Sequence, residues 1–187
     1  MTNFEFVFSL FGLLLGLALA ELLSGFGAAL QSRKKVRLGW LTPLLGLFVA
    51  LDVTTFWSLA WSVRDQIPAH NFSMMFGLVM NGLYYLVARL VFPREPAEWP
   101  DYDQYYFAHR KLVLGGVIAC NLLAYVAQMA VGYDPFEIPL YNWASVVFFV
   151  MVPATMFVRG RRANIVLLAL LSLIYPLISF TAIATGV

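Results

Sequence analysis

Six long apolar stretches follow one another along the chain, and short polar connections separate them. They cover residues 4–30, 38–61, 71–92, 110–131, 140–158 and 163–185. A helix needs about 20 apolar residues to cross the roughly 30 Å hydrocarbon layer of a membrane. The pattern therefore predicts an all-α fold, a polytopic integral membrane bundle of six transmembrane helices. We expect residues 1–187 to form one transmembrane domain.

The composition agrees with this prediction, and the absence of common motifs excludes several classes of function. Hydrophobic residues make up 61% of the chain and charged residues 12%, against about a quarter charged in a soluble domain. The chain lacks a phosphate-binding glycine loop, a His-Glu-x-x-His motif and a Gly-x-Ser-x-Gly motif, which would indicate common enzyme sites. We therefore predict no catalytic residue, no metal, no cofactor and no nucleic-acid partner.

The positions of the basic residues predict the orientation in the membrane. All 12 lysines and arginines except Arg64 lie in or beside three alternate connections, two of which are residues 33–37 and 159–162. Connections rich in lysine and arginine stay in the cytoplasm. Both termini are then external, the lipid bilayer is the surrounding partner, and the bacterial inner membrane is the expected location.

Residues 93–109 form the one substantial polar connection, on the predicted cytoplasmic side. Asp101 is followed three residues later by Gln104, a spacing typical of a helix N-terminus. The tyrosines after Asp101 then predict an interfacial helix on the membrane surface. Alternatively, the acids of this segment and His109 bind a divalent cation or a basic partner, although their spacing matches no recognised metal motif.

Small residues recur every four positions along the first apolar stretch. They are Gly12, Gly16, Ala20, Ser24 and Ala28. Such a ladder lets a second helix approach closely within a membrane. Because it is longer than one crossing inside the chain requires, it predicts a homo-oligomer or a partner membrane subunit.

Polar residues near the middle of five stretches are the candidate functional residues. Glu21, Asp52, Asn81, Asn121 and Tyr175 lie roughly 15 to 20 Å from the basic ends of their helices at about 1.5 Å per residue. Further polar residues follow on the same faces: Tyr85 and Arg89 after Asn81, and Tyr125 and Gln128 after Asn121. Polar groups at one depth without water should meet, so we expect an internal polar cleft.

Arg89 has two alternatives within this cluster. Its long stem can reach inward to Glu21 or carry the guanidinium outward to the headgroups. We expect the outward position.

Glu21 and Asp52 support two interpretations of the protein. A low-dielectric site favours the protonated form of a carboxyl group, so the pair could handle a proton or cation. The protein is then a small channel or secondary transporter for a proton, a cation or a small polar solute. In the other interpretation the acids only fix helix packing, in a structural or assembly subunit. An intramembrane enzyme is a weaker third alternative, because no pair of nucleophile and base is visible.

The lysine and arginine pattern makes a topological prediction. Cysteine accessibility labelling or reporter fusions should place residues 33–37 and 159–162 in the cytoplasm and both termini outside. A cytoplasmic C-terminus would contradict the six-span arrangement.

Overall fold

A computed structural model describes residues 3–67, 70–134 and 139–185, and in this part of the chain the protein is all-helical. Two short 3-10 helices, Arg64–Gln66 and Pro96–Glu98, lie in the connections. The six α-helices are α1 (Asn3–Ser32), α2 (Leu41–Ser62), α3 (Asn71–Val91), α4 (Tyr102–Ala130), α5 (Pro139–Phe157) and α6 (Arg161–Thr185).

Five of these helices, as far as they are described, are long and apolar enough to cross a membrane. The exception is α5, whose apolar part is the shorter segment Asn142–Phe157. Length and hydropathy thus support an integral membrane protein with transmembrane helices. The predicted all-α class is confirmed, and five rather than six of the predicted spans meet the length and hydropathy expected of a crossing.

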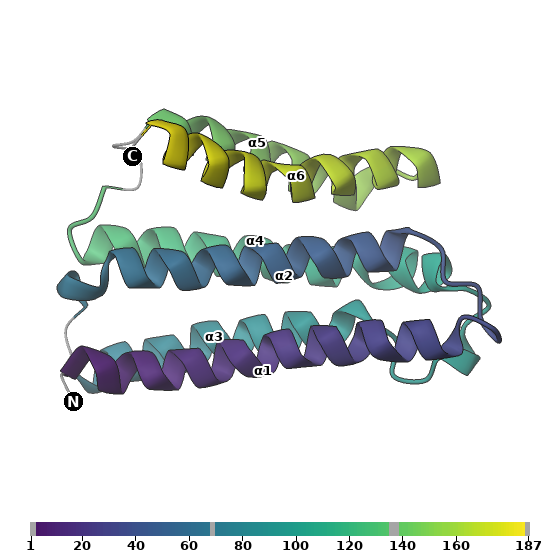
Figure 1. The fold of residues 1–187 in the computed structure, drawn as a ribbon, viewed down its shortest axis with the longest axis horizontal. Coiled ribbons are helices and arrows are strands. Elements are labelled where there is room, and N and C mark those ends of the chain that lie inside the picture. Colours follow the sequence, from purple (N-terminus) through teal and green to yellow (C-terminus); the bar gives the residue numbers. More distant parts are fainter. Residues whose placement is uncertain (1–2, 68–69, 135–138, 186–187) are drawn as a thin grey trace.

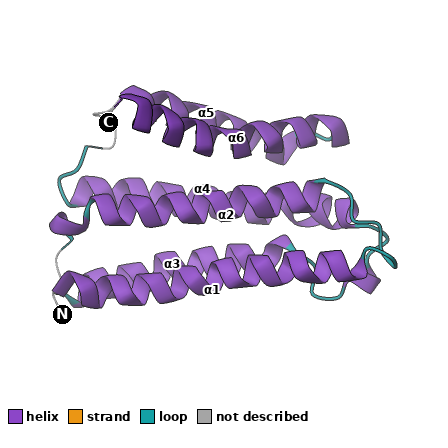
Figure 2. Ribbon diagram, in the orientation of Figure 1, coloured by secondary structure: helices purple, strands orange, loops and turns teal. Residues whose placement is uncertain are grey.

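The helices form three layers of two (Figure 1). The pair α2 and α4 lies between the pair α1 and α3 and the pair α5 and α6, and only helices appear among the described elements (Figure 2). Both chain ends lie at one end of the bundle, which we call the terminal end. The opposite end, which we call the basic end, holds the connections containing residues 33–40, 92–101 and 158–160.

The core lies along the central layer, because α2 and α4 have neighbours on both sides. Phe48, Val49 and Val117 are fully buried there, whereas α1 exposes leucines such as Leu13 and Leu23. Exposed leucines on an outer helix suit contact with lipid chains, which are equally apolar. Close packing between α1 and α3 within their layer depends on glycine, because a Cβ at Gly77 of α3 would lie 1.8 Å from the ring of Phe11 of α1.

The predicted helix start at Asp101 is confirmed, but the segment that follows is not a surface helix. The backbone N–H of Gln104 donates to Asp101 Oδ1 at 2.7 Å. From Tyr102 a single helix, α4, continues without a break to Ala130. Tyr102 and Tyr106 are each only 1% exposed, so they pack inside the bundle and not on its surface.

Hydroxyl partners on other helices explain why these tyrosines are buried. The Tyr102 and Ser32 hydroxyls lie 2.8 Å apart, and Tyr106 Oη donates to Asn164 Oδ1 at 2.7 Å. Tyr105 Oη donates to the carbonyl of Leu90 at 3.0 Å. The start of α4 is therefore tied to α1, α3 and α6, and these contacts hold the basic end together.

Asp103 joins the first residues of two further helices at this end. Its Oδ1 accepts from the backbone N–H of Leu41 at 3.2 Å, and its Oδ2 lies 2.6 Å from Arg161 Nη2. A negative charge is favourable at a helix N-terminus. Gly39 is required beside it, because its φ is +64° and a Cβ would lie 2.1 Å from Asp103 Oδ1.

We expect Asp103→Ala to destabilise the fold by about 1–3 kcal/mol, the usual cost of leaving a buried donor without its acceptor. Unfolding of the purified protein in mild detergent, followed by circular dichroism, measures the effect. Glu98→Gln is the control, because Glu98 is an exposed acid of the same end. Equal unfolding midpoints for Asp103→Ala and the control would contradict the role of Asp103.

Candidate functional site

The centre of the candidate site is Asp52, a buried carboxylate halfway along α2. Three other helices supply its hydrogen-bond donors. Tyr84 Oη of α3 donates to Oδ2 at 3.0 Å, and Tyr175 Oη of α6 donates to Oδ1 at 2.8 Å. Asn121 Nδ2 of α4 lies 3.1 Å and 3.2 Å from the two carboxylate oxygens. Helices α2, α3, α4 and α6 therefore meet at this one side chain.

All of these partners are donors, and none of them carries a charge. An ionised carboxylate accepts hydrogen bonds only, so this arrangement satisfies it without a proton. Without such partners, burying the group would be costly. The geometry can therefore accommodate an ionised carboxylate, and none of the side chains bonded to Asp52 would compensate its charge.

A polar cleft of about 620 Å³ leads to Asp52 between α2, α4, α5 and α6. Its lining residues extend from Ser62 and Tyr133 near the terminal end to Asp52 and Leu171, about halfway through the bundle. Its wall is largely apolar, but hydroxyl groups are also exposed on it. They belong to Thr54, Thr55, Ser58, Ser62, Tyr84, Tyr125, Tyr133, Ser145, Tyr175 and Ser179.

Apolar packing closes the bundle on the other side of Asp52. Phe48 and Val49 precede Asp52 on α2, towards the basic end, and neither is exposed. Leu114 of α4 and Leu168 of α6 are likewise fully buried at the corresponding level of their helices. The lining residues of the cleft therefore lie in the half of the bundle nearer the terminal end, and apolar packing fills the half beyond Asp52.

The stripe predicted on the fourth span lines this cleft as a unit. Asn121, Tyr125 and Gln128 all contribute to its wall. The Tyr125 hydroxyl forms a hydrogen bond with that of Ser145 on α5, and Gln128 Nε2 donates to the carbonyl of Ala124 at 3.2 Å. The helical spacing of four and three residues thus identified side chains on one face.

Of the predicted polar residues, five line the cleft and four lie elsewhere. The lining residues are Asp52, Asn121, Tyr125, Gln128 and Tyr175. Glu21, Asn81, Tyr85 and Arg89 are not among the lining residues. Asn81 is fully buried, and neither polar atom of its amide has a hydrogen-bond partner in the described part of the chain.

Tyr84 is the functional candidate that the sequence analysis missed. The prediction chose Tyr85, four residues after Asn81, but Tyr84 is the neighbour that reaches Asp52. Adjacent residues of a helix point in directions about 100° apart. A signal was present, because Tyr84 is three residues after Asn81 and so also shares a face with it.

Glu21 has a different partner from Asp52. It forms an ion pair with Arg89 of α3, and both side chains are partly exposed. The inward alternative for Arg89 is therefore the one observed, and the expected outward position was wrong. A carboxylate paired with a guanidinium is compensated in charge, so Glu21 and Asp52 stand in electrically different sites.

The small-residue ladder of α1 is only partly used inside the chain. A Cβ at Gly12 would lie 3.0 Å from the Trp57 ring, whereas one at Gly16 would meet no atom within 4 Å. Ala20, Ser24 and Ala28 are exposed. This face of α1 is therefore available for close packing by a second membrane helix.

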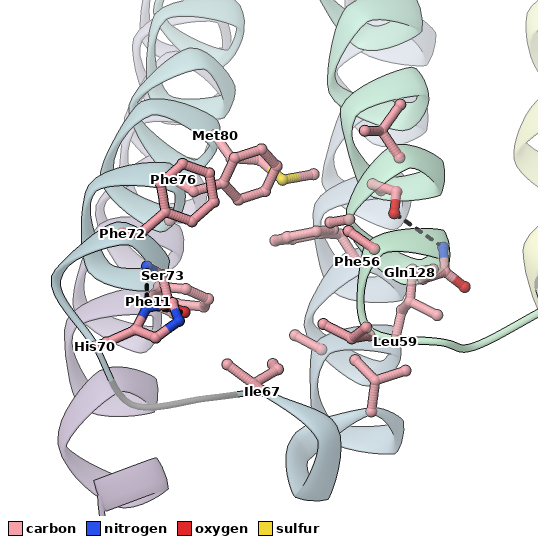
Figure 3. A pocket seen from close by; sticks show the side chains of 18 residues that line it. Phe11, Phe56, Leu59, Ile67, His70, Phe72, Ser73, Phe76, Met80 and Gln128 are labelled. Carbon is pink, nitrogen blue, oxygen red and sulfur yellow. Dashed lines mark hydrogen bonds between the residues drawn. The ribbon is translucent and has the colours of Figure 1, made fainter.

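A second cavity, of about 330 Å³, lies between α1 and α3 on one side and α2 and α4 on the other (Figure 3). Its wall is mainly apolar, with Phe11, Phe72 and Phe76 on one side. His70 lies at its margin, where Nδ1 accepts from the Ser73 backbone N–H at 3.4 Å as the cap of α3. Phe56 and Gln128 line both this pocket and the polar cleft.

Comparisons of the chain with protein-family models, with curated proteins and with solved structures find no match. The chemistry of the cleft follows from its residues. A buried carboxylate held by uncharged donors, with several hydroxyl oxygens nearby, suits the binding of a small positively charged species. Among the described residues no group of three histidine, cysteine or acidic side chains could hold a metal ion.

The Glu21 and Arg89 pair predicts a non-additive double-mutant cycle. Glu21→Gln and Arg89→Met should each destabilise the protein by about 1–2 kcal/mol, because each leaves a poorly solvated partner behind. The double variant should lose about 1 kcal/mol less than the sum. Unfolding in detergent gives the three values.

Asp101→Asn supplies the control for this cycle. Asparagine caps a helix as well as aspartate does, and Asp101 caps α4 at the basic end. Its effect should add to that of Glu21→Gln. Additivity of Glu21→Gln with Arg89→Met as well would show that the ion pair does not couple the two helices.

Proposed function

We propose that this protein is a small membrane channel or secondary transporter that moves a proton, a cation or a small polar solute. The observation that carries the proposal is the cleft of about 620 Å³ that ends at the buried carboxylate of Asp52. Ionisable residues inside membrane helices are costly and commonly mark ion or solute pathways. Asp52 is held by neutral donors, so its charge remains available to a bound cation.

The shape of the cleft favours a secondary transporter over an open channel. A channel requires a continuous polar path, but here Phe48, Val49 and Leu168 fill the bundle beyond Asp52. A site at mid-depth that opens to one side fits alternating access, in which one group of helices rocks against another. The outer pair of helices, α5 and α6, is a candidate for the moving group, because the cleft lies between this pair and the central pair α2 and α4.

The proposed topology sets the direction of access. With six spans and both termini external, the terminal end faces outward and the basic end faces the cytoplasm. The cleft then opens to the outside in this conformation. The proposed location is the bacterial inner membrane.

A structural or assembly subunit is the second candidate. The observation that favours it is the exposed face of α1 at Ala20, Ser24 and Ala28, which suits a close helix contact. A homo-oligomer is compatible with both candidates, because this face of α1 does not include residues of the cleft. The two candidate functions predict different results when the Asp52 charge is removed: only a transporter would lose flux.

We expect Asp52→Asn to reduce transport strongly while leaving the fold in place. Wild-type protein in liposomes should carry protons, potassium ions or methylammonium faster than protein-free liposomes. A pH-sensitive dye and radiolabelled cations measure these fluxes. Removing the negative charge should reduce the active flux at least tenfold, since no other charged side chain lines the described wall of the cleft.

Asp101→Asn is the matched control, with the same chemical change outside the cleft. It should transport like the wild type. If the wild type carries none of the three species, or if Asp52→Asn retains full flux, the transport proposal fails. Loss of oligomer size in Gly16→Leu and Ala20→Leu variants, together with absent flux, would favour the structural subunit.

A further inference from the structure

We infer that the cation bound in the cleft is a small organic ammonium ion, with its charge facing Asp52 and its carbon groups against aromatic rings. This inference rests on the proposed function, because it names the substrate class of the same cleft. It follows from the rings around the carboxylate, from the acceptors on the wall, and from the volume.

Two groups of aromatic rings meet at Asp52. Tyr84, which donates to its Oδ2, packs against Phe56 with ring centroids 5.2 Å apart. Tyr175, which donates to its Oδ1, packs against Phe48 at 6.0 Å. Aromatic faces attract organic cations, and quaternary ammonium groups are commonly held in cages of such rings.

The second group of rings continues along the wall towards the terminal end. Phe48 stacks with Phe148 at 6.2 Å, and Phe148 lies 5.2 Å from Phe149. Phe149 in turn lies 5.8 Å from Tyr125. Phe148, Phe149 and Tyr125 all line the cleft, so a cation that enters the cleft passes aromatic surface on its way to Asp52.

Hydroxyl oxygens provide acceptors for the N–H groups of an ammonium ion. Tyr84 and Tyr175 use their protons to bond Asp52, and their oxygens keep lone pairs free to accept. Further along the wall, Thr55, Ser58 and Ser179 add hydroxyl oxygens. The carboxylate can therefore act on a cation through the tyrosine oxygens while it stays within its hydrogen-bond network.

Other solutes fit this site less well. Calcium and magnesium ions require about six or more oxygen ligands, usually with several carboxylates, and the described wall has one carboxylate. A proton alone needs no cavity of about 620 Å³. An anionic group would need a lysine, arginine or histidine, and the described lining residues include none.

Binding to the full-length protein in lipid nanodiscs tests the inference. Isothermal titration calorimetry with tetramethylammonium and ethylammonium at constant ionic strength should show saturable binding. We expect at least a tenfold loss of affinity in Asp52→Asn and unchanged affinity in Asp101→Asn. Phe148→Leu should weaken binding of tetramethylammonium, which has no N–H group and depends most on aromatic contact.

Tyr175→Phe covers the case in which Asp52→Asn does not fold. It keeps the ring and removes one acceptor, so it should weaken ethylammonium more than tetramethylammonium. Sodium or potassium ions that compete at equal concentration would overturn the inference, as would equal binding of the neutral isostere tert-butanol. Circular dichroism and size-exclusion chromatography verify that each variant is folded.

The flux measurement separates this inference from the proposed function. Asp52-dependent proton or potassium flux, without any binding of the ammonium ions, would overturn the ammonium inference and leave transport in place. Absence of both binding and flux would overturn the two together. Ammonium binding that Asp52→Asn does not change would locate the ligand outside the cleft and overturn the inference.

Discussion

Burial of the Asp52 carboxylate is the constraint on which the arrangement of the bundle depends. A charge inside an apolar bundle is tolerated only when other groups replace its lost hydration. Here three helices supply those groups, through Tyr84, Asn121 and Tyr175. A rotation or shift of any one of these helices would remove one of the donors to the carboxylate. The position of the charge therefore fixes the relative register of α2, α3, α4 and α6.

The two ends of the molecule differ because their polar groups are used differently. At the basic end, polar side chains form hydrogen bonds with neighbouring helices and hold the layers together. They belong to Tyr102, Tyr106 and Asp103. Towards the terminal end, residues such as Ser58 and Ser62 line a cleft. Polar side chains thus close one half of the bundle and line a cleft in the other half. This asymmetry is what relates the fold to the proposed one-sided entry of a solute.

The sequence predicted the helices well and the polar centre in part. Length, hydropathy and the Asp101 cap locate the helices, because these are properties of single segments. The depth of a residue along its helix also follows from residue counting. Counting placed Asp52, Asn121 and Tyr175 at a similar depth, and these three side chains are in contact. The direction in which a side chain points across the bundle depends on how the helices rotate against each other. For that reason counting selected Tyr85 in place of Tyr84 and placed Tyr102 and Tyr106 on the surface.

The contrast between the two membrane acids locates the charge that is available for function. Glu21 faces the guanidinium of Arg89, so the pair is close to neutral as a unit. Asp52 is held by two phenols and an amide, which stabilise its charge but do not cancel it. Only the second arrangement leaves an attractive field for a positively charged solute. The cleft ends at Asp52 and does not include Glu21, so the accessible polar space and the uncompensated charge coincide.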